Sequence, residues 1–313
     1  MQKNQSSYLT FGSLMIALFA ILIAMSVYVP ILTIITSLIA PLPLAWYSAK
    51  FERKESLLVM VVAIFISFII GGIVGLTLGL VVGSVGFIIG DSLRKKQSKL
   101  YMLMAAGIFV LLMTAVQYII SILVLNMNLI EQFLEGTKIY YEQAGKILET
   151  AGQKPKNYDE MVKQIIIAFE AMLPTLFILM AFLQAFVYVS ILLPILKKLK
   201  VPVPKFPKYM YFKLPKAVLW YYLVVAIISL VTTFEVGTFS YMLIINATFL
   251  LRALLLLQGI SIIQYYFHVQ GWPKWSAILA TFLAIPLNSF VIILGVLDLG
   301  FNLRAYLKDR FKK

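Results

Sequence analysis

The chain has 313 residues, of which 62% are hydrophobic and 13% are charged, and this composition excludes an ordinary soluble domain. Most of the net charge of +14 lies in short loops beside apolar runs, which indicates membrane topology rather than nucleic-acid binding. The absence of cysteine excludes disulfides and cysteine-ligated metal, and a single histidine, His268, cannot form a histidine cluster. We therefore expect an all-α, polytopic membrane helix bundle.

Apolar runs of about 20 residues, long enough to cross a hydrocarbon core about 30 Å thick, recur along almost the whole chain. They predict about 8 to 9 hydrophobic segments, at 9–29, 31–48, 56–70, 72–90, 100–125, 165–196, 217–234, 241–267 and 275–300. The first segment lacks a cationic leader and a clear cleavage site, so we interpret it as a mature helix.

The fourth segment belongs to GGIVGLTLGLVVGSVGFIIGD, Gly71–Asp91, which contains seven glycines. On a helix that turns about 100° per residue, these glycines share one sector of about 120°. We interpret this stripe, including Gly75, Gly79, Gly83 and Gly86, as a seam for a neighbouring helix, with a helix of the same chain favoured over another protein. In the alternative, the first two glycines turn the chain between the third and fourth segments, and the seam starts at Gly75.

The stretch also spells GDSL, at Gly90–Leu93, the nucleophile signature of a serine esterase family. That chemistry needs a histidine base delivered by a later DxxH motif, and the chain has none. Walker A and HExxH motifs are absent as well. We expect a protein that is not an enzyme and that needs no cofactor or metal.

Basic clusters predict the topology. Lysine and arginine gather at 50–54, 94–99, 197–216 and 304–313, and the positive-inside rule places all four clusters, with the N-terminus, in the cytoplasm. The connection 127–164 then lies outside, and its apolar spacing up to the GQKPKN break predicts a helical hairpin. This hairpin is either a lid over an outward-facing cavity or a plain extension of two long helices.

The linker 197–216 has seven lysines, four prolines and no acid, so we expect it to lie extended along the inner membrane surface. Such a segment is attracted to anionic lipid by about 1 kcal/mol per lysine. Ordinary positive-inside anchoring and a docking strip for a cytoplasmic partner are the alternatives.

Arg252 lies in the middle of its segment, where a charge costs about 2.5 to 3.5 kcal/mol on insertion scales. A second polar stripe on the same helix includes Asn246, Gln258 and Gln264. One hypothesis makes these four residues contacts for an anionic substrate or headgroup. The other makes Arg252 half of a structural pair with an acid near a segment end, namely Glu170, Glu235 or Asp298.

The last segment raises a topological conflict. Three full crossings after residue 216 would leave the basic tail outside, against the positive-inside rule. Pro286 divides 275–300 into two arms that are too short to span, which favours a re-entrant hairpin and a cytoplasmic tail. A single kinked helix is the alternative.

Several stretches resemble the YybS-like membrane proteins of Firmicutes: TFGSLMIALFAILIAMSVYVPIL, APLPLAW, VPVPKFPKYMYFKLP and residues 246–259. That family is distantly similar to the substrate-binding S components of ECF (energy-coupling factor) vitamin transporters over the first six segments. S components dock through AxxxA motifs in the first helix, which Ala20–Ala24 resembles. The expected organisation is an S-component-like domain at 1–200, with the hairpin at 127–164, the linker at 197–216 and C-terminal membrane helices at 217–313.

The resemblance implies a protein of the bacterial cell membrane that binds a small-molecule or lipid-like ligand and relies on partner subunits for transport. Genes of the family often lie beside one for a membrane-bound cyclic-di-AMP phosphodiesterase. This association implies the alternative, a membrane scaffold or regulator in signalling or envelope processes that carries no transported substrate.

Overall fold

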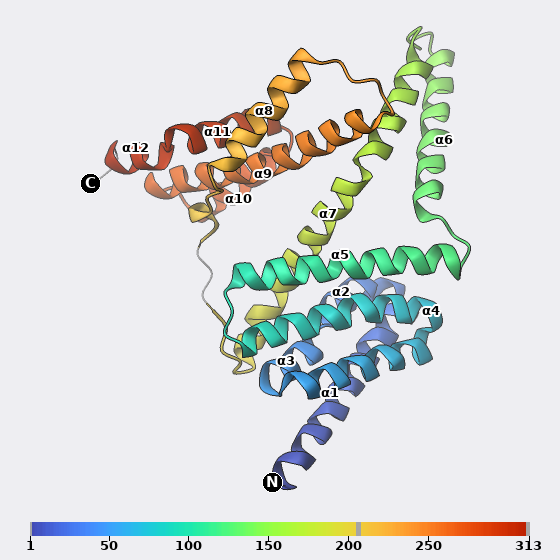
Figure 1. Ribbon diagram of the computed structural model, residues 1–313, viewed down its shortest axis with the longest axis vertical. Coiled ribbons are helices and arrows are strands. Elements are labelled where there is room, and N and C mark those ends of the chain that lie inside the picture. Colours follow the sequence, from blue (N-terminus) through green and yellow to red (C-terminus); the bar gives the residue numbers. More distant parts are fainter. Residues whose placement is uncertain (1, 205–207, 311–313) are drawn as a thin grey trace. The chain divides into compact units, whose positions relative to one another are not determined.

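The computed structural model describes residues 2–204 and 208–310, and all of their regular elements are helical (Figure 1). The elements are α1 (Gln2–Tyr28), η1 (Pro30–Leu32), α2 (Thr33–Ile39), α3 (Leu42–Lys50), α4 (Arg53–Arg94), α5 (Lys99–Leu123), α6 (Leu129–Thr150), α7 (Tyr158–Lys198), η2 (Tyr209–Tyr211), α8 (Ala217–Val231), α9 (Phe239–Val269), α10 (Lys274–Leu283), α11 (Asn288–Phe301) and α12 (Leu303–Arg310).

The expected all-α membrane bundle is confirmed for the described part of the chain. Six helical stretches are long and apolar enough to cross a membrane, or seven if the bent pair α10 and α11 counts as one. The number of spans is lower than the expected 8 to 9 segments. One reason is that two expected segments, 56–70 and 72–90, lie within the 42-residue helix α4. In addition, α8 has only 15 residues.

The chain forms two compact units. The first, here called the N-terminal unit, comprises Met1–Gln132 and Phe177–Lys205. The second, the C-terminal unit, comprises Phe133–Leu176 and Phe206–Lys313. Most of α6 and the first half of α7, which together form a hairpin, therefore group with the C-terminal helices.

Helix α4 is a hairpin rather than a single rod. Gly71 and Gly72 leave the helical conformation, and Gly72 has a φ of 56°, a left-handed value that glycine adopts without strain. The second arm then packs on the first through its glycines. A Cβ at Gly79 would lie 2.7 Å from the Cβ and Oγ of Ser67, and one at Gly75 would collide with the Ser67 carbonyl oxygen.

Further along the second arm, the same seam meets α3. A Cβ at Gly86 would lie 2.5 Å from the carbonyl oxygen of Pro41, and one at Gly90 would collide with that of Ala45. Gly83 lies between the two partners, against Ile64 and Leu44. The neighbours of the seam therefore belong to the same chain.

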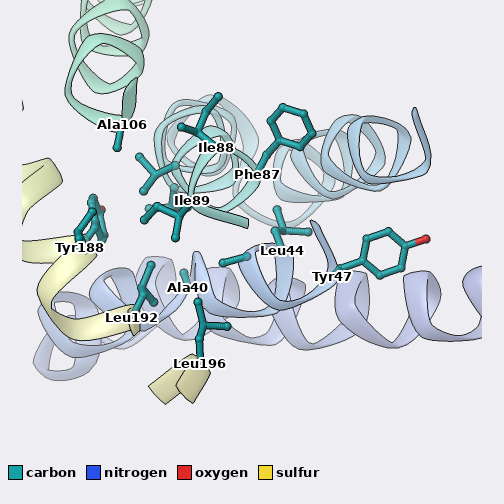
Figure 2. Close-up of a cluster of buried hydrophobic side chains, with 14 of the residues drawn as sticks. Ala40, Leu44, Tyr47, Phe87, Ile88, Ile89, Ala106, Tyr188, Leu192 and Leu196 are labelled. Atoms are coloured by element: carbon teal, nitrogen blue, oxygen red, sulfur yellow. The ribbon is translucent and has the colours of Figure 1, made fainter. Parts of the chain in front are cut away.

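The core of the N-terminal unit is apolar and continuous. Side chains from α3, α4 and α7, among them Leu44, Ile89 and Leu192, gather into one cluster (Figure 2). Helix α1 contributes the fully buried Phe19 and Ile23 to this core. Its residues Ala20 and Ala24 are half-buried.

One ion cluster closes the base of the α4 hairpin. Asp91, near the end of the second arm, lies 3.0 Å from Lys95 and 3.9 Å from Arg53 at the start of the first arm. Arg94 also pairs with Asp91. The buried carboxylate therefore joins the two ends of the hairpin.

In the C-terminal unit, α6 and the first half of α7 form an antiparallel hairpin, visible as the two green helices of Figure 1. The linker contains only the short turn η2 within its described residues. Helices α10 and α11, of 10 and 14 residues, are bent by 112° at their junction. Each is shorter than the roughly 20 residues that a crossing needs, and the bend turns α11 back.

Candidate functional site

Helix α9 carries the four polar residues that the sequence predicts as ligand contacts. Asn246 lies nearest the start of this helix. The Asn246 Nδ2 donates to the carbonyl oxygen of Ala171 at 2.5 Å, and its Oδ1 accepts from the Thr175 amide at 3.2 Å and the Thr175 Oγ1 at 2.6 Å. Its Nδ2 also donates to Met242 within α9. The side chain joins α9 to α7 and has no polar atom left over.

The groups that Asn246 binds lie on either side of Pro174 in α7. Proline lacks the N–H of a regular helix and its ring crowds the preceding turn, so the backbone near it needs other partners inside a membrane. Ala171 and Thr175 are four residues apart, the pair that a regular helical hydrogen bond joins. Asn246 bonds to both of them.

A buried network lies farther along α9. Gln258 and Asp298 are completely buried, and the Gln258 Nε2 donates to the Asp298 Oδ2 at 2.5 Å. The Gln258 Oε1 accepts from the Leu214 amide of the linker at 2.9 Å. Gln258 therefore ties α9 to both α11 and the linker.

Arg304 of α12 completes this network. Its Nε donates to the Asp298 Oδ2 at 3.0 Å, and its two terminal nitrogens donate to the carbonyl oxygens of Met210 and Phe212 at 2.9 and 2.7 Å. A further bond reaches the Ser261 Oγ at 3.0 Å. Arg304 is only 11% exposed, so a residue of the basic tail neutralises the buried carboxylate and fastens the linker.

The chain reaches this arrangement through tight backbone contacts. Gly259 of α9 and Gly295 of α11 lie against backbone carbonyls of Val291 and Leu255, where a Cβ would collide. Asn302 adopts a left-handed conformation that ends α11 and turns the chain into α12. This turn directs Arg304 back toward Asp298.

The linker is held by side chains on both sides. The Tyr209 hydroxyl donates to the Leu257 carbonyl oxygen at 2.7 Å, and burial raises the pKa of this phenol above its ordinary value. The Ser261 hydroxyl lies within 2.9 Å of the carbonyl oxygens of Tyr209 and Phe212. Lys213 donates to the Asn302 Oδ1 at 2.7 Å, so the linker and the start of α12 lie at the same level.

Two nominated residues remain. The Gln264 Nε2 donates to Thr281 of α10 at 3.0 Å. Arg252, near the middle of α9, is exposed and makes no hydrogen bond or ion pair with any residue that the structure describes. Asp298, one of its expected partners, pairs with Arg304 instead.

The four predicted ligand contacts thus fall into two groups according to their hydrogen-bond partners. Asn246, Gln258 and Gln264 have internal hydrogen-bond partners, whereas Arg252 has none within the described chain. The sequence reading missed Arg304, because an arginine in a basic C-terminal run has the pattern of a topology signal. The signal that could have found it is Asp298, an acid in an apolar segment that requires a buried cation nearby.

Comparison with known proteins identifies relatives. The family model "Predicted membrane protein (DUF2232)" matches residues 17–299. The "Uncharacterized protein YybS" of Bacillus subtilis (strain 168) is 27% identical over 314 residues, which cover 97% of this chain and 100% of the relative. The resemblance to YybS-like proteins is thereby confirmed. No solved structure matches the chain, and the likeness to ECF S components stays a prediction.

Proposed function

The chain belongs to the DUF2232 family of membrane proteins, and on that premise we propose that it binds an anionic small-molecule or lipid-like ligand at Arg252. In this proposal the protein is not an enzyme. It works in the manner of an S component, capturing the ligand within the membrane while partner subunits supply the energy for translocation.

The position of Arg252 carries the proposal. An arginine near the middle of a membrane helix is costly, by about 2.5 to 3.5 kcal/mol, and such residues usually pair with protein groups or mark a functional path. Asp298, one of its three expected acidic partners, pairs with Arg304, and the described chain offers Arg252 no hydrogen bond or ion pair with the other two or with any other residue. An anionic group on a ligand would satisfy the guanidinium by charge-assisted hydrogen bonds.

Native mass spectrometry of the purified full-length protein tests this role. We expect the wild-type protein to retain an anionic small molecule or lipid, the Arg252→Gln variant to lose it, and the Arg252→Lys variant to retain part of it. Folded yield and thermal stability, measured separately, show that each variant is intact. Equal retention by wild type and by intact Arg252→Gln would contradict the proposal.

We also propose an orientation with both termini and the linker 197–216 in the cytoplasm, where its lysines face anionic lipid. The contact of Arg304 with Met210 and Phe212 supports a tail on the same side as the linker. An even number of crossings then separates the linker from the tail. In this proposal the apolar segment 217–234, which includes α8 and the three residues after it, crosses once, α9 crosses back, and α10 and α11 form a re-entrant hairpin. Because the chain has no cysteine, single cysteines at Lys216 and Lys308 can be labelled in intact cells. Impermeant maleimide should reach neither of them.

A second candidate is a membrane scaffold or regulator without a transported substrate. The exposed Ser13 and Ala17 on α1 favour it, because small residues on an open helix face permit close approach of another membrane helix. Co-purification separates the candidates. Recovery with ATPase and coupling subunits supports transport, whereas recovery with only signalling or envelope proteins supports the scaffold.

A further inference from the structure

The hairpin of α6 and α7 has a half-open cavity of about 470 Å³ between its two helices, within the size range of small-molecule sites. Two contacts define its position. At the tip, the Tyr158 hydroxyl donates to the Tyr141 carbonyl oxygen at 2.8 Å, and the Tyr158 ring packs on Gly145. At the base, Phe133 stacks on Phe169 with ring centroids 5.5 Å apart.

The lining of this cavity combines an apolar side with unpaired charge. Val162, Ile166 and Ile167 of α7 supply the apolar surface, and all three are half-buried. Lys138 of α6 and Lys163 of α7 line the same cavity.

Neither lysine makes a hydrogen bond or ion pair with another residue in the described ranges. The cavity also contains two carboxylates. Asp159 is neutralised by Lys154, whose Nζ lies 3.2 Å from it. Glu142, like the two lysines, has no ion-pair partner among the residues that the structure places. The lining therefore includes two unpaired ammonium groups and one unpaired carboxylate among the described residues, and this balance of charge favours an anion.

We propose that this cavity is a binding site for an amphipathic anion, whose negative head lies between Lys138 and Lys163 and whose apolar body covers Ile166 and Ile167. Burial of the apolar part stabilises the complex by removing hydrocarbon from water, and the ammonium groups select the charge of the head. The site is separate from Arg252 and goes beyond the role proposed for that residue. Both lie in the C-terminal unit.

The cysteine-free chain permits a direct test by alkylation of a single introduced thiol. The full-length Val162→Cys protein in nanodiscs is treated with a maleimide in the presence of octanoate, octylammonium or inorganic phosphate. At octanoate concentrations of about three times Kd, alkylation should slow about four-fold, because only the unoccupied site reacts. Octylammonium and inorganic phosphate should leave the rate unchanged.

Two further variants complete the test. Lys138→Gln combined with Lys163→Gln should abolish protection by octanoate, while Arg252→Gln should leave it intact. A single cysteine at Ile147, which is 70% exposed on α6 and lies outside the cavity, controls for general effects of the amphiphile and should label at one rate throughout. Equal protection by octylammonium, protection by phosphate alone, or protection that survives the double lysine variant would overturn the proposal.

Discussion

The N-terminal unit and the C-terminal unit are each stabilised by a different kind of internal contact. In the N-terminal unit, glycines let α4 fold against itself and against α3, and the core that follows is apolar. In the C-terminal unit, side-chain hydrogen bonds and a buried ion pair join α7, α9, α11, α12 and the linker. Both solutions are understandable in lipid, where no hydrophobic force drives apolar helices together.

This difference shows which polar side chains have a structural role, because they have partners inside their own unit. The N-terminal unit confines its strongest ion cluster to Asp91, at the base of the hairpin. The C-terminal unit places amides and a carboxylate inside its helix contacts, and each has a partner. Against that background, Arg252 differs because it has no partner within the described chain.

The largest loss of stability is expected at the ion pair. Arg304→Gln leaves the completely buried Asp298 without its cation, and removing one partner of a buried pair costs about 3 to 5 kcal/mol. Thermal unfolding of the purified protein in detergent measures the loss. Adding Asp298→Asn to the variant should restore part of the stability, and an additive double variant would contradict the pairing.

The glycine seam should give the next largest effect. Gly79→Leu forces a side chain into the space occupied by Ser67, and such overpacking costs about 1 to 3 kcal/mol. Gly136→Leu in α6 is the matched control, because a Cβ there meets nothing within 4 Å. The seam would be refuted if the two variants unfolded at the same temperature as wild type.

The amide bridge should contribute less. Asn246→Leu removes the bonds to Ala171 and Thr175, and side-chain hydrogen bonds between membrane helices average about 0.6 kcal/mol with a maximum near 1.7. A double-mutant cycle with Thr175→Val isolates the pair. We expect a coupling energy of about 1 kcal/mol, and independent effects would exclude the bridge.

Tyr209→Phe should give the smallest change, about 0.5 kcal/mol, because it removes one bond to Leu257 from a side chain that is 36% exposed. The raised pKa of the Tyr209 phenol also predicts that the free energy of unfolding depends on pH. Burial raises the folded-state pKa of this phenol above its ordinary value of 10.0, so the unfolded chain loses the proton first. The free energy of unfolding should therefore fall as the pH rises above about 10, and Tyr209→Phe should reduce that fall.

Much of the architecture is readable from the sequence, because lipid imposes length and polarity on each segment. The glycine spacing from Gly75 to Gly86 indicated a seam, and its neighbours in the structure are Ser67, Ile64 and α3. The hairpin of α6 and α7 follows from helical spacing and the GQKPKN break. These features depend on residues that are close in the sequence, so the spacing of glycine and apolar residues predicts them.

Long-range polar pairing is harder to read. Asn246 and Gln258 look like ligand contacts on a helical wheel, because a wheel does not show that Ala171 and Thr175 lie beside Asn246 or that Asp298 lies across from Gln258. Arg304 is far from both in the chain and lies in a basic tail. Its role depends on the turn at Asn302, which residue spacing does not predict.

Thermal unfolding of Arg252→Gln and Arg304→Gln, measured side by side after exhaustive removal of bound lipid and small molecules, separates a functional arginine from a structural one. We expect Arg304→Gln to lose about 3 to 5 kcal/mol and Arg252→Gln to remain within about 0.5 kcal/mol of wild type. A loss at Arg252 as large as that at Arg304 would show that Arg252 supports the fold, and it would contradict the ligand-binding role.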